Sequence, residues 1–331
     1  MSAADGIGRR TAVATLASVG ALAVAPRLAR AQSLETAKIL IGFAPGGTID
    51  LAGRRVAEKL QGGYARTALV ENRTGAGGQI AVQAVKSAAP DGATILLTPT
   101  SPLSLHFFTY RKVPYEASEL APVSGAASFD YALAVGPMVP AAVKTAPEFL
   151  GWCKANPDKA NFGSAGNGSA AHFLGAALAR AGQTEVRHVA FRGSQPAVLD
   201  MIGGQIAAVV GPTGDFMPSV QSGKIRLLAT SGPKRGTHTP AVPTFAEQGV
   251  RDVAYTGWFG FYVAARTPTE TVQRLNAAVR AALAAPETAS VFAASFMEPM
   301  PTSPEQLAAL LKSETEFWSG LVKAVGFTPE G

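Results

Sequence analysis

Short apolar runs alternate with amphipathic segments along most of the chain, and this alternation restricts the possible folds more than any other feature. Residues 38–43 have the length and composition of a strand, and a glycine turn follows them. Apolar residues then recur at helical spacing, which defines one helix face as Ile49, Ala52, Val56 and Leu60. Alternation of this kind is typical of parallel sheets that helices cover.

The same pattern continues to the end of the chain. Further strands are expected at residues 68–70, 95–98, 131–135, 161–163, 186–191, 207–210, 225–230 and 259–264, with helices between them. The length of 331 residues allows about two domains of ordinary size. A composition of 47% apolar and 16% charged residues is that of a globular protein. We therefore expect an α/β fold throughout the mature chain.

Three helix starts are predicted from capping boxes, in which a hydroxyl residue is followed three positions later by Glu or Gln. They lie at residues 145–148, 267–270 and 303–306, and each also contains a proline near the first helical position. These signals concern structure and carry no chemistry.

Residues 1–31 have the pattern of a cleaved export signal. Arg9 and Arg10 precede an uncharged run over residues 11–25, and residues 29–31 read Ala-Arg-Ala, a small-x-small cleavage site. The run is about 15 residues, short of the roughly 20 needed to cross a bilayer. The paired arginines favour the twin-arginine route. We therefore expect a periplasmic protein that is processed near Ala31 and has no membrane anchor.

The formal net charge of +6 overstates the basicity of the processed chain, because four arginines and one aspartate before residue 32 account for +3 of it. No run of basic residues interleaved with aromatics is present, which argues against nucleic acid as a partner. A mildly basic balance is compatible with an anionic ligand. Cys153 is the only cysteine, so stability must come from packing and not from an intrachain disulfide.

The first candidate site is the turn that links the first expected strand to the first helix. Its candidate ligand-binding residues are Phe43, Ala44, Pro45, Gly46, Gly47 and Asp50. Backbone N–H groups converge at such a helix N-terminus, where partial positive charge attracts an anion. A branched side chain at Gly47 is expected to block the anion and to disfavour a positive φ. Two readings stay open, since the turn can be a plain connection and Asp50 can simply stabilise the helix.

A second glycine turn with the same chemistry spans residues 163–169, again after a strand and before a helix. Its candidate residues are Ser164, Ala165, Gly168, Ser169 and His172. Two facing turns can grip one carboxylate. His172 can instead be a capping or core histidine.

Three further positions complete the candidate set. Asp215 follows an expected strand and either caps a helix or lines the site. Arg192 and Gly193 follow another strand, where the arginine can complete an anion site or remain solvated. Thr98 ends the strand expected at residues 95–98.

No cofactor or metal is expected. Gly166, Gly168 and Ala171 match the dinucleotide pattern, but that site needs an acid at the end of the next strand, where Phe191 and Arg192 stand. The sequence contains neither a G-x-x-x-x-G-K phosphate loop nor a G-x-S-x-G elbow. The histidines are scattered without metal-ligand spacing, at positions 106, 172, 188 and 238.

Taken together, these motifs resemble the periplasmic solute receptors of tripartite tricarboxylate transporters, the Bug-type proteins. The resemblance is collinear over nearly all of the mature sequence and includes FAPGGTID from Phe43, ENRTGAGG from Glu71, PDGATILL from Pro90, GSAGNGS from Gly163, AFRGSQPA from Ala190, SGKIRLLA from Ser222 and VPTFAEQG from Val242. Phe191 and Thr74 stand where Tyr and Pro are common, and residues 101–110 lack the usual Asn-Pro pair. Those ten positions are expected to border the far end of the ligand, so the departure leaves ligand identity open.

The resemblance implies a type II periplasmic-binding-protein fold, in which crossing strands join two α/β lobes and the ligand lies between them. Carried onto this chain, it assigns residues 32–130 and 258–331 to lobe 1 and residues 131–257 to lobe 2. It also places the ligand carboxylate between the turn at residues 45–47 and the turn at residues 164–169. Backbone N–H groups and waters are expected to hold it.

We therefore expect a monomeric receptor, not an enzyme, that closes by hinge motion on a small carboxylate and presents it to membrane transporter subunits. The ligand classes that remain open are di- and tricarboxylates, aromatic acids and amino acids. A receptor whose occupied form signals to a partner protein is one alternative. A hydrolase that uses Ser164 or Ser169 is another, although the sequence offers no recognisable base–acid pair.

Overall fold

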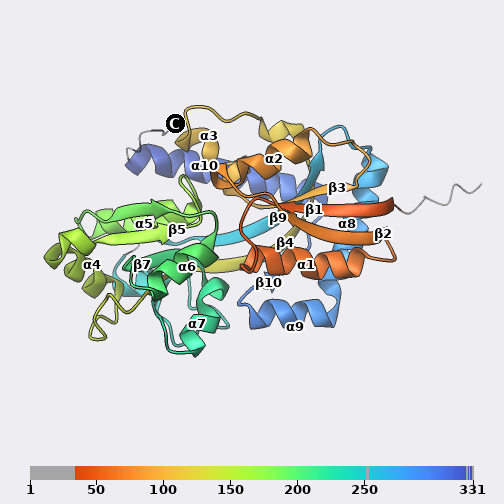
Figure 1. Ribbon diagram of the computed structural model, residues 1–331. Coiled ribbons are helices and arrows are strands. Elements are labelled where there is room, and N and C mark those ends of the chain that lie inside the picture. Colours follow the sequence, from red (N-terminus) through yellow and green to blue (C-terminus); the bar gives the residue numbers. More distant parts are fainter. Residues whose placement is uncertain (1–33, 251–252, 326, 328, 330–331) are drawn as a thin grey trace, which may run out of the picture. The chain divides into compact units, whose positions relative to one another are not determined.

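The computed structural model describes residues 34–250, 253–325, 327 and 329 (Figure 1). The export signal expected at residues 1–31 lies outside this range. From Leu34 onward the described chain forms one compact unit. None of its helices combines the length and apolar character needed to cross a membrane.

Strands and helices alternate as the sequence pattern predicts. The strands are β1 (Leu34–Ile41), β2 (Ala65–Asn72), β3 (Thr94–Pro99), β4 (Leu120–Val135), β5 (Asn161–Ser164), β6 (Arg187–Ala190), β7 (Ala208–Pro212), β8 (Arg226–Thr230), β9 (Thr256–Ala264) and β10 (Glu298–Pro299). The helices are α1 (Thr48–Leu60), α2 (Gln79–Lys86), α3 (His106–Thr109), α4 (Ala146–Ala155), α5 (Ala170–Ala181), α6 (Ser194–Ile202), α7 (Met217–Gln221), α8 (Thr269–Ala284), α9 (Pro286–Ala294) and α10 (Pro304–Val325). The predicted α/β class is confirmed.

The strands form one mixed sheet in the order β2-β1-β3-β9-β4-β7-β5-β6, and β8 and β10 also pair with β4. Pairing is parallel among β1, β2 and β3 and among β5, β6 and β7. It is antiparallel wherever β4 or β9 takes part. The expected parallel pairing thus holds toward both ends of the sheet, and two antiparallel strands run between them.

Strand β4 is much longer than the segment 131–135 expected from sequence. Residues 120–130 pair with β9, and residues 131–135 pair with β7 and β8. The first part lacks a strand signal because it contains Pro122 and Gly125 and its register shifts near both. A Cβ on Gly125 would lie 2.4 Å from the Met300 carbonyl oxygen, so close packing explains the glycine. The partners of β4 change at the expected lobe boundary, and the division into lobes itself stays a prediction.

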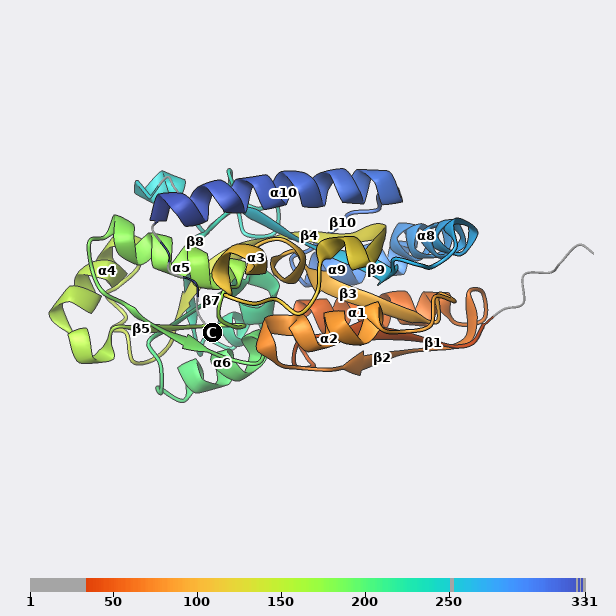
Figure 2. The same cartoon turned by 90° about the horizontal axis from the view of Figure 1, so that it is seen from above.

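Alternate residues of β1 face two separate hydrophobic clusters. Ile39 and Ile41 pack in the cluster that contains the apolar faces of α1 and α8, whereas Leu40 packs with α2. Figure 1 shows α1 and α2 on opposite sides of these strands. Helix α10 packs on β4, along which it runs in Figure 2. Both faces of the central strands are therefore covered, as expected for an α/β protein.

Two of the three predicted capping boxes are confirmed. At α4 and α10 the hydroxyls of Thr145 and Ser303 accept from the backbone N–H three residues later, and the reciprocal bonds are also present. The box predicted at residues 267–270 is wrong, because Pro268 is the N-cap of α8 and no side chain caps it. The Thr267 N–H instead donates to the Ala264 carbonyl and closes the turn after β9.

Candidate functional site

The N-terminal ends of α1 and α5 line the same pocket, whose empty space is about 580 Å³ when its mouth is included. The lining residues are Phe43, Ala44, Gly47, Thr48, Ile49, Gly77, Pro99, Ser101, Tyr131, Ala165, Ser169, Ala171, Ser194, Pro212, Asp215 and Phe259. The two glycine turns singled out in the sequence are thus brought together although more than a hundred residues separate them.

The α1 turn is held by the carboxylate of Asp50 and the groups that donate hydrogen bonds to it. The carboxylate of Asp50 accepts from Gly46 N–H at 3.1 Å, from Asn72 Nδ2 at 2.9 Å and from two nitrogens of Arg54 at 2.9 and 3.0 Å. Burial raises the pKa of Asp50, but the hydrogen bonds from these partners outweigh it and the net pKa is lowered. Asp50 does not line the pocket, so its contacts support the helix-stabilising reading.

The turn differs from expectation in which glycine takes the left-handed conformation. Gly46 has φ 90°, whereas Gly47 is the N-cap of α1 with φ −84°. The expected positive φ at Gly47 is therefore wrong. Pro45 and Gly46 are exposed and lie outside the pocket lining, while Gly47 faces it.

The residues after β6 approach the α1 turn through the backbone. Ala44 N–H donates to the Arg192 carbonyl at 2.9 Å, and a Cβ on Gly193, whose φ is 137°, would lie 3.0 Å from the Ala44 nitrogen. The Arg192 side chain is exposed and lines a neighbouring pocket that shares Gly77 and Ala165 with the first. Arg192 and Gly193 therefore pack against the α1 turn and do not line the main pocket.

The α5 turn is held by neutral groups. Ser164 is fully buried, and its Oγ lies 2.7 Å from His188 Nε2. Gly168 N–H donates to His172 Nδ1 at 3.2 Å, and the His172 ring stacks on His188 at 3.7 Å. Burial lowers the pKa of His172 to about 4 and that of His188 to about 3, so both rings are neutral near pH 7. Ser164, Gly168 and His172 stand behind the pocket, not in its lining.

The lining at α5 carries hydroxyl groups. Ser169 caps the helix by accepting from His172 N–H at 3.2 Å, and Ser101 Oγ accepts from Ala170 N–H at 3.1 Å. A hydroxyl that accepts from the backbone still has its own hydrogen to donate, either to a ligand or, for Ser169, to Ser164 Oγ at 3.4 Å. Ser101 lies in residues 101–110, the stretch expected to border the far end of the ligand, but it was not named as a site residue, because nothing in the sequence connects it to a helix that begins far along the chain.

Asp215 combines the two roles expected for it as alternatives. It lines the pocket, and its Oδ1 accepts from Thr48 N–H at the start of α1 at 2.6 Å. Its side chain is also hydrogen-bonded to Ser194. Burial raises its pKa, and the bonds from Thr48 and Ser194 oppose that rise without cancelling it. The N-terminus of α1 thus already holds a carboxylate of the protein.

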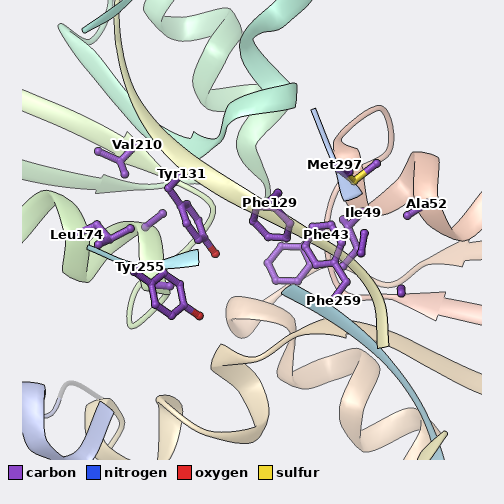
Figure 3. Packing of buried hydrophobic residues seen from close by; sticks show 14 of the residues in the cluster. Phe43, Ile49, Ala52, Phe129, Tyr131, Leu174, Val210, Tyr255, Phe259 and Met297 are labelled. Carbon is purple, nitrogen blue, oxygen red and sulfur yellow. The ribbon is translucent and has the colours of Figure 1, made fainter. Parts of the chain in front are cut away.

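The aromatic rings of Phe43, Tyr131 and Phe259 line one wall of the pocket. Figure 3 shows Phe43, Phe129 and Phe259 gathered beside Tyr131, with the Phe129 ring 4.4 Å from Phe259 and 5.3 Å from Tyr131. Tyr131 and Phe259 were overlooked because they stand within apolar strand runs. Thr98 is 2% exposed and the next residue, Pro99, lines the pocket instead, since neighbours on a strand point to opposite faces.

Among the described residues no group of three or more His, Cys, Asp or Glu side chains could hold a metal ion. Within the same residues no carboxylate is hydrogen-bonded to His188. The Ser164–His188 contact therefore lacks the third member of a nucleophilic triad, and Ser164 itself is fully buried.

Most of the chain matches known proteins of one family. The family described as the tripartite tricarboxylate transporter family receptor matches residues 52–327. A Pseudomonas sp. UPF0065 protein from a tcbD-tcbE intergenic region is 33% identical, covering 96% of this chain and 94% of its own. BugT of Bordetella pertussis is 31% identical over 87% of this chain and 89% of its own.

Solved structures agree with this result. A periplasmic transporter structure is 31% identical with a TM-score of 0.82, covering 87% of this chain and 96% of its own. Rpa4515 of R. palustris with adipate has a TM-score of 0.85 at 26% identity over 89% and 98% of the two chains. MatC from Rhodopseudomonas palustris with bound malate has a TM-score of 0.81 at 26% identity over 87% and 98%. The predicted periplasmic-binding fold is thereby confirmed.

Proposed function

This chain belongs to the tripartite tricarboxylate transporter receptor family, a family of non-enzymatic periplasmic binding proteins, and from this premise we propose that it binds one small carboxylate in the pocket between α1 and α5. Relatives of similar fold are described with adipate and with malate, both carboxylates. The single observation that carries the proposal is that the N-terminus of α5, with the hydroxyls of Ser101 and Ser169 beside it, opens into the pocket.

The α5 end of the pocket suits the carboxylate best. Ser101 and Ser169 have hydroxyl hydrogens to donate there, and Ala171, in the first turn of α5, also lines the pocket. The partial positive charge at the helix N-terminus favours an anion at this position. Waters can extend the contacts, as is usual in sites of this kind.

The rest of the pocket suits an apolar ligand body. Phe43, Ile49 and Phe259 contribute a wall without charge, and no lysine or arginine lines the pocket among the described residues. Backbone N–H groups and hydroxyls therefore supply the donors for an anion, which fits a ligand recognised by its carboxylate and its shape.

Closure by hinge motion is part of the proposal. The α1 turn contacts the segments that follow β6 and β7 through Ala44 N–H, which donates to the Arg192 carbonyl, and Thr48 N–H, which donates to Asp215, and opening would break these two bonds. Strands β4 and β9, which run between the two parallel parts of the sheet, are the elements about which these parts would rotate. A monomer with lobes divided at residues 130 and 257 would present its closed form to transporter subunits in the membrane.

The decisive experiment is calorimetric titration of the processed protein with adipate, malate and benzoate, each paired with its amide. We expect at least one acid to bind and its amide to bind about tenfold or more weakly, because charge-assisted hydrogen bonds are lost. Ser101→Ala should weaken binding of the acid, whereas Ser118→Ala, at an exposed residue of the short 3-10 helix Ala117–Glu119 that does not line this pocket, should not. Equal affinity for acid and amide would contradict carboxylate recognition.

Export is tested separately. We expect the periplasmic protein to begin near Gln32, and replacement of Arg9 and Arg10 by lysine should retain it in the cytoplasm if the twin-arginine route is used. Periplasmic protein that still begins before residue 11 would contradict cleavage of the expected signal.

A further inference from the structure

From the lining of this pocket we infer that Asp215 is a specificity-determining residue that selects a ligand carrying a cationic ammonium group in addition to its carboxylate. The inference rests on the proposed function, because it assigns the second polar end of the same ligand. It makes this chain a receptor for an amino-carboxylate in preference to a di- or tricarboxylate.

The first step is that Asp215 is a buried carboxylate without a cationic partner. It is 6% exposed, and its hydrogen-bond donors are the neutral Thr48 N–H and Ser194. Arg54, in α1, is already paired with Asp50, and Arg192 lines the neighbouring pocket. Burying a carboxylate without an opposite charge is unfavourable, so a ligand cation at this position would be bound favourably.

The second step is that the pocket has two chemically different ends. Hydroxyl donors of Ser101 and Ser169 gather at α5, while the carboxylate acceptor stands at α1. A ligand with a carboxylate at one end and an ammonium group at the other matches both. A ligand with two carboxylates matches only the α5 end.

The third step is that a second carboxylate is excluded from α1. Asp215 Oδ1 already accepts from Thr48 N–H at 2.6 Å, and a Cβ on Gly47 would lie only 3.4 Å from this oxygen. A ligand carboxylate that sought the same helix N-terminus would have to face a like charge at close range. Asp215, for which the sequence left a helix cap and a site residue equally open, thus decides which ligands are rejected.

The test uses two sets of probes that differ only in one end group. 4-Aminobutanoate, pentanoate and glutarate share a carbon chain that ends in ammonium, methyl or carboxylate. Phenylalanine, 3-phenylpropanoate and benzylmalonate make the same comparison at the α-carbon. For the processed wild-type protein we expect the amino member of at least one set to bind about 10- to 100-fold more tightly than the other two.

The variant Asp215→Asn should reverse this order, because Asn keeps an oxygen for Thr48 N–H but loses the charge. The amino-carboxylate should weaken about 10- to 100-fold and the dicarboxylate should tighten about tenfold. Asp200→Asn makes the same chemical change on the exposed face of α6 and should alter neither. Thermal melts of both variants verify that they are folded.

The outcomes separate the two proposals. If wild type binds pentanoate or glutarate as tightly as 4-aminobutanoate and the phenylalanine set behaves likewise, the role of Asp215 is overturned and carboxylate binding stands. The same holds if Asp215→Asn is folded and leaves the ratio within a set unchanged. If no carboxylate among the probes or the acids named above binds, carboxylate recognition fails and the inference fails with it.

Discussion

The turns before α1 and α5 both lead from a strand to a helix N-terminus, but charged groups hold the first and neutral groups hold the second. Charged side chains surround the first, with Asp50 held by Arg54 behind it and Asp215 held by Thr48 N–H in front. The second is built from serine hydroxyls and two stacked neutral histidines. Two similar glycine turns therefore give different helix N-termini. The N-terminus of α1 is occupied by the Asp215 carboxylate, whereas that of α5 has hydroxyl groups that can donate hydrogen bonds to a ligand.

This difference has consequences for stability as well as for ligand choice. The α1 turn keeps its contacts with Asp50 as long as that carboxylate stays charged, and the pKa of Asp50 is lowered. A turn held by buried neutral histidines keeps its contacts only while the rings stay uncharged. Four experiments test whether the two turns differ in this way.

Acidification should cause the largest loss in the free energy of unfolding. The groups responsible include His172 and His188, which hold the α5 turn. The pKa values of His172, His188 and His106 are lowered by burial to about 4, about 3 and about 3, below the unfolded value of 6.5. Below pH 6.5 the unfolded chain binds protons that the folded chain refuses, so stability falls as pH falls toward those values. Each histidine contributes about 1.4 kcal/mol per pH unit within this window.

Urea denaturation at pH 7 and pH 5 measures this loss, and His172→Gln should reduce it by roughly one histidine's share. The lowered pKa of Asp50 predicts that its contribution is lost only when the pH falls below 3.8, so the α1 turn should stay intact over this range. Equal free energies of unfolding at the two pH values would contradict the prediction.

Removing the carboxylate behind the α1 turn should have the next largest effect. Asp50→Ala leaves Gly46 N–H, Asn72 and the half-exposed Arg54 without their shared acceptor, and we expect a loss of about 3 kcal/mol in the free energy of unfolding. Asp50→Asn keeps an acceptor oxygen and should lose about half as much. A loss below 1 kcal/mol for Asp50→Ala would show that the turn does not depend on this cluster.

The same substitution in the two turns should give different results. Gly168 has φ 63°, and its Cβ would lie 2.5 Å from Thr109 Oγ1, so Gly168→Ala should destabilise the protein by about 2 kcal/mol. Gly47 has φ −84° and ordinary contacts, so Gly47→Ala should change stability by less than about 0.5 kcal/mol. Thermal denaturation compares the two variants, and similar losses would mean that the turns are not distinguished by backbone strain.

Loss of the helix cap at α5 should have the smallest effect. Ser169→Ala removes the oxygen that accepts from His172 N–H, and we expect a cost of about 1 kcal/mol. Ser303→Ala removes the equivalent cap from α10 and should cost a similar amount. Only Ser169→Ala should also weaken a bound acid, because Ser169 lines the pocket and Ser303 does not.

The local parts of the fold could be predicted because they depend on neighbours in the sequence. Both glycine turns, the strands beside them and the caps at Thr145 and Ser303 follow from residues a few positions apart. The first part of β4 could not be predicted, since Pro122 and Gly125 weaken its local signal and pairing with β9 compensates. The sequence predicts Thr98 as a site residue, but Pro99 lines the pocket instead. Neighbouring residues on a strand point to opposite faces, so an error of one residue selects the wrong side chain.

What the sequence determined by itself is the alternation of strands and helices, the two helix N-termini that can receive an anion, and the resemblance to a receptor family. What only the tertiary structure decided is which groups meet at those termini. Asp215 reaches Thr48 across 167 positions, and Ser101 reaches Ala170 across 69. Contacts over such separations depend on the order of strands in the sheet, and strand order follows from the burial of the whole chain, not from the chemistry of any one segment.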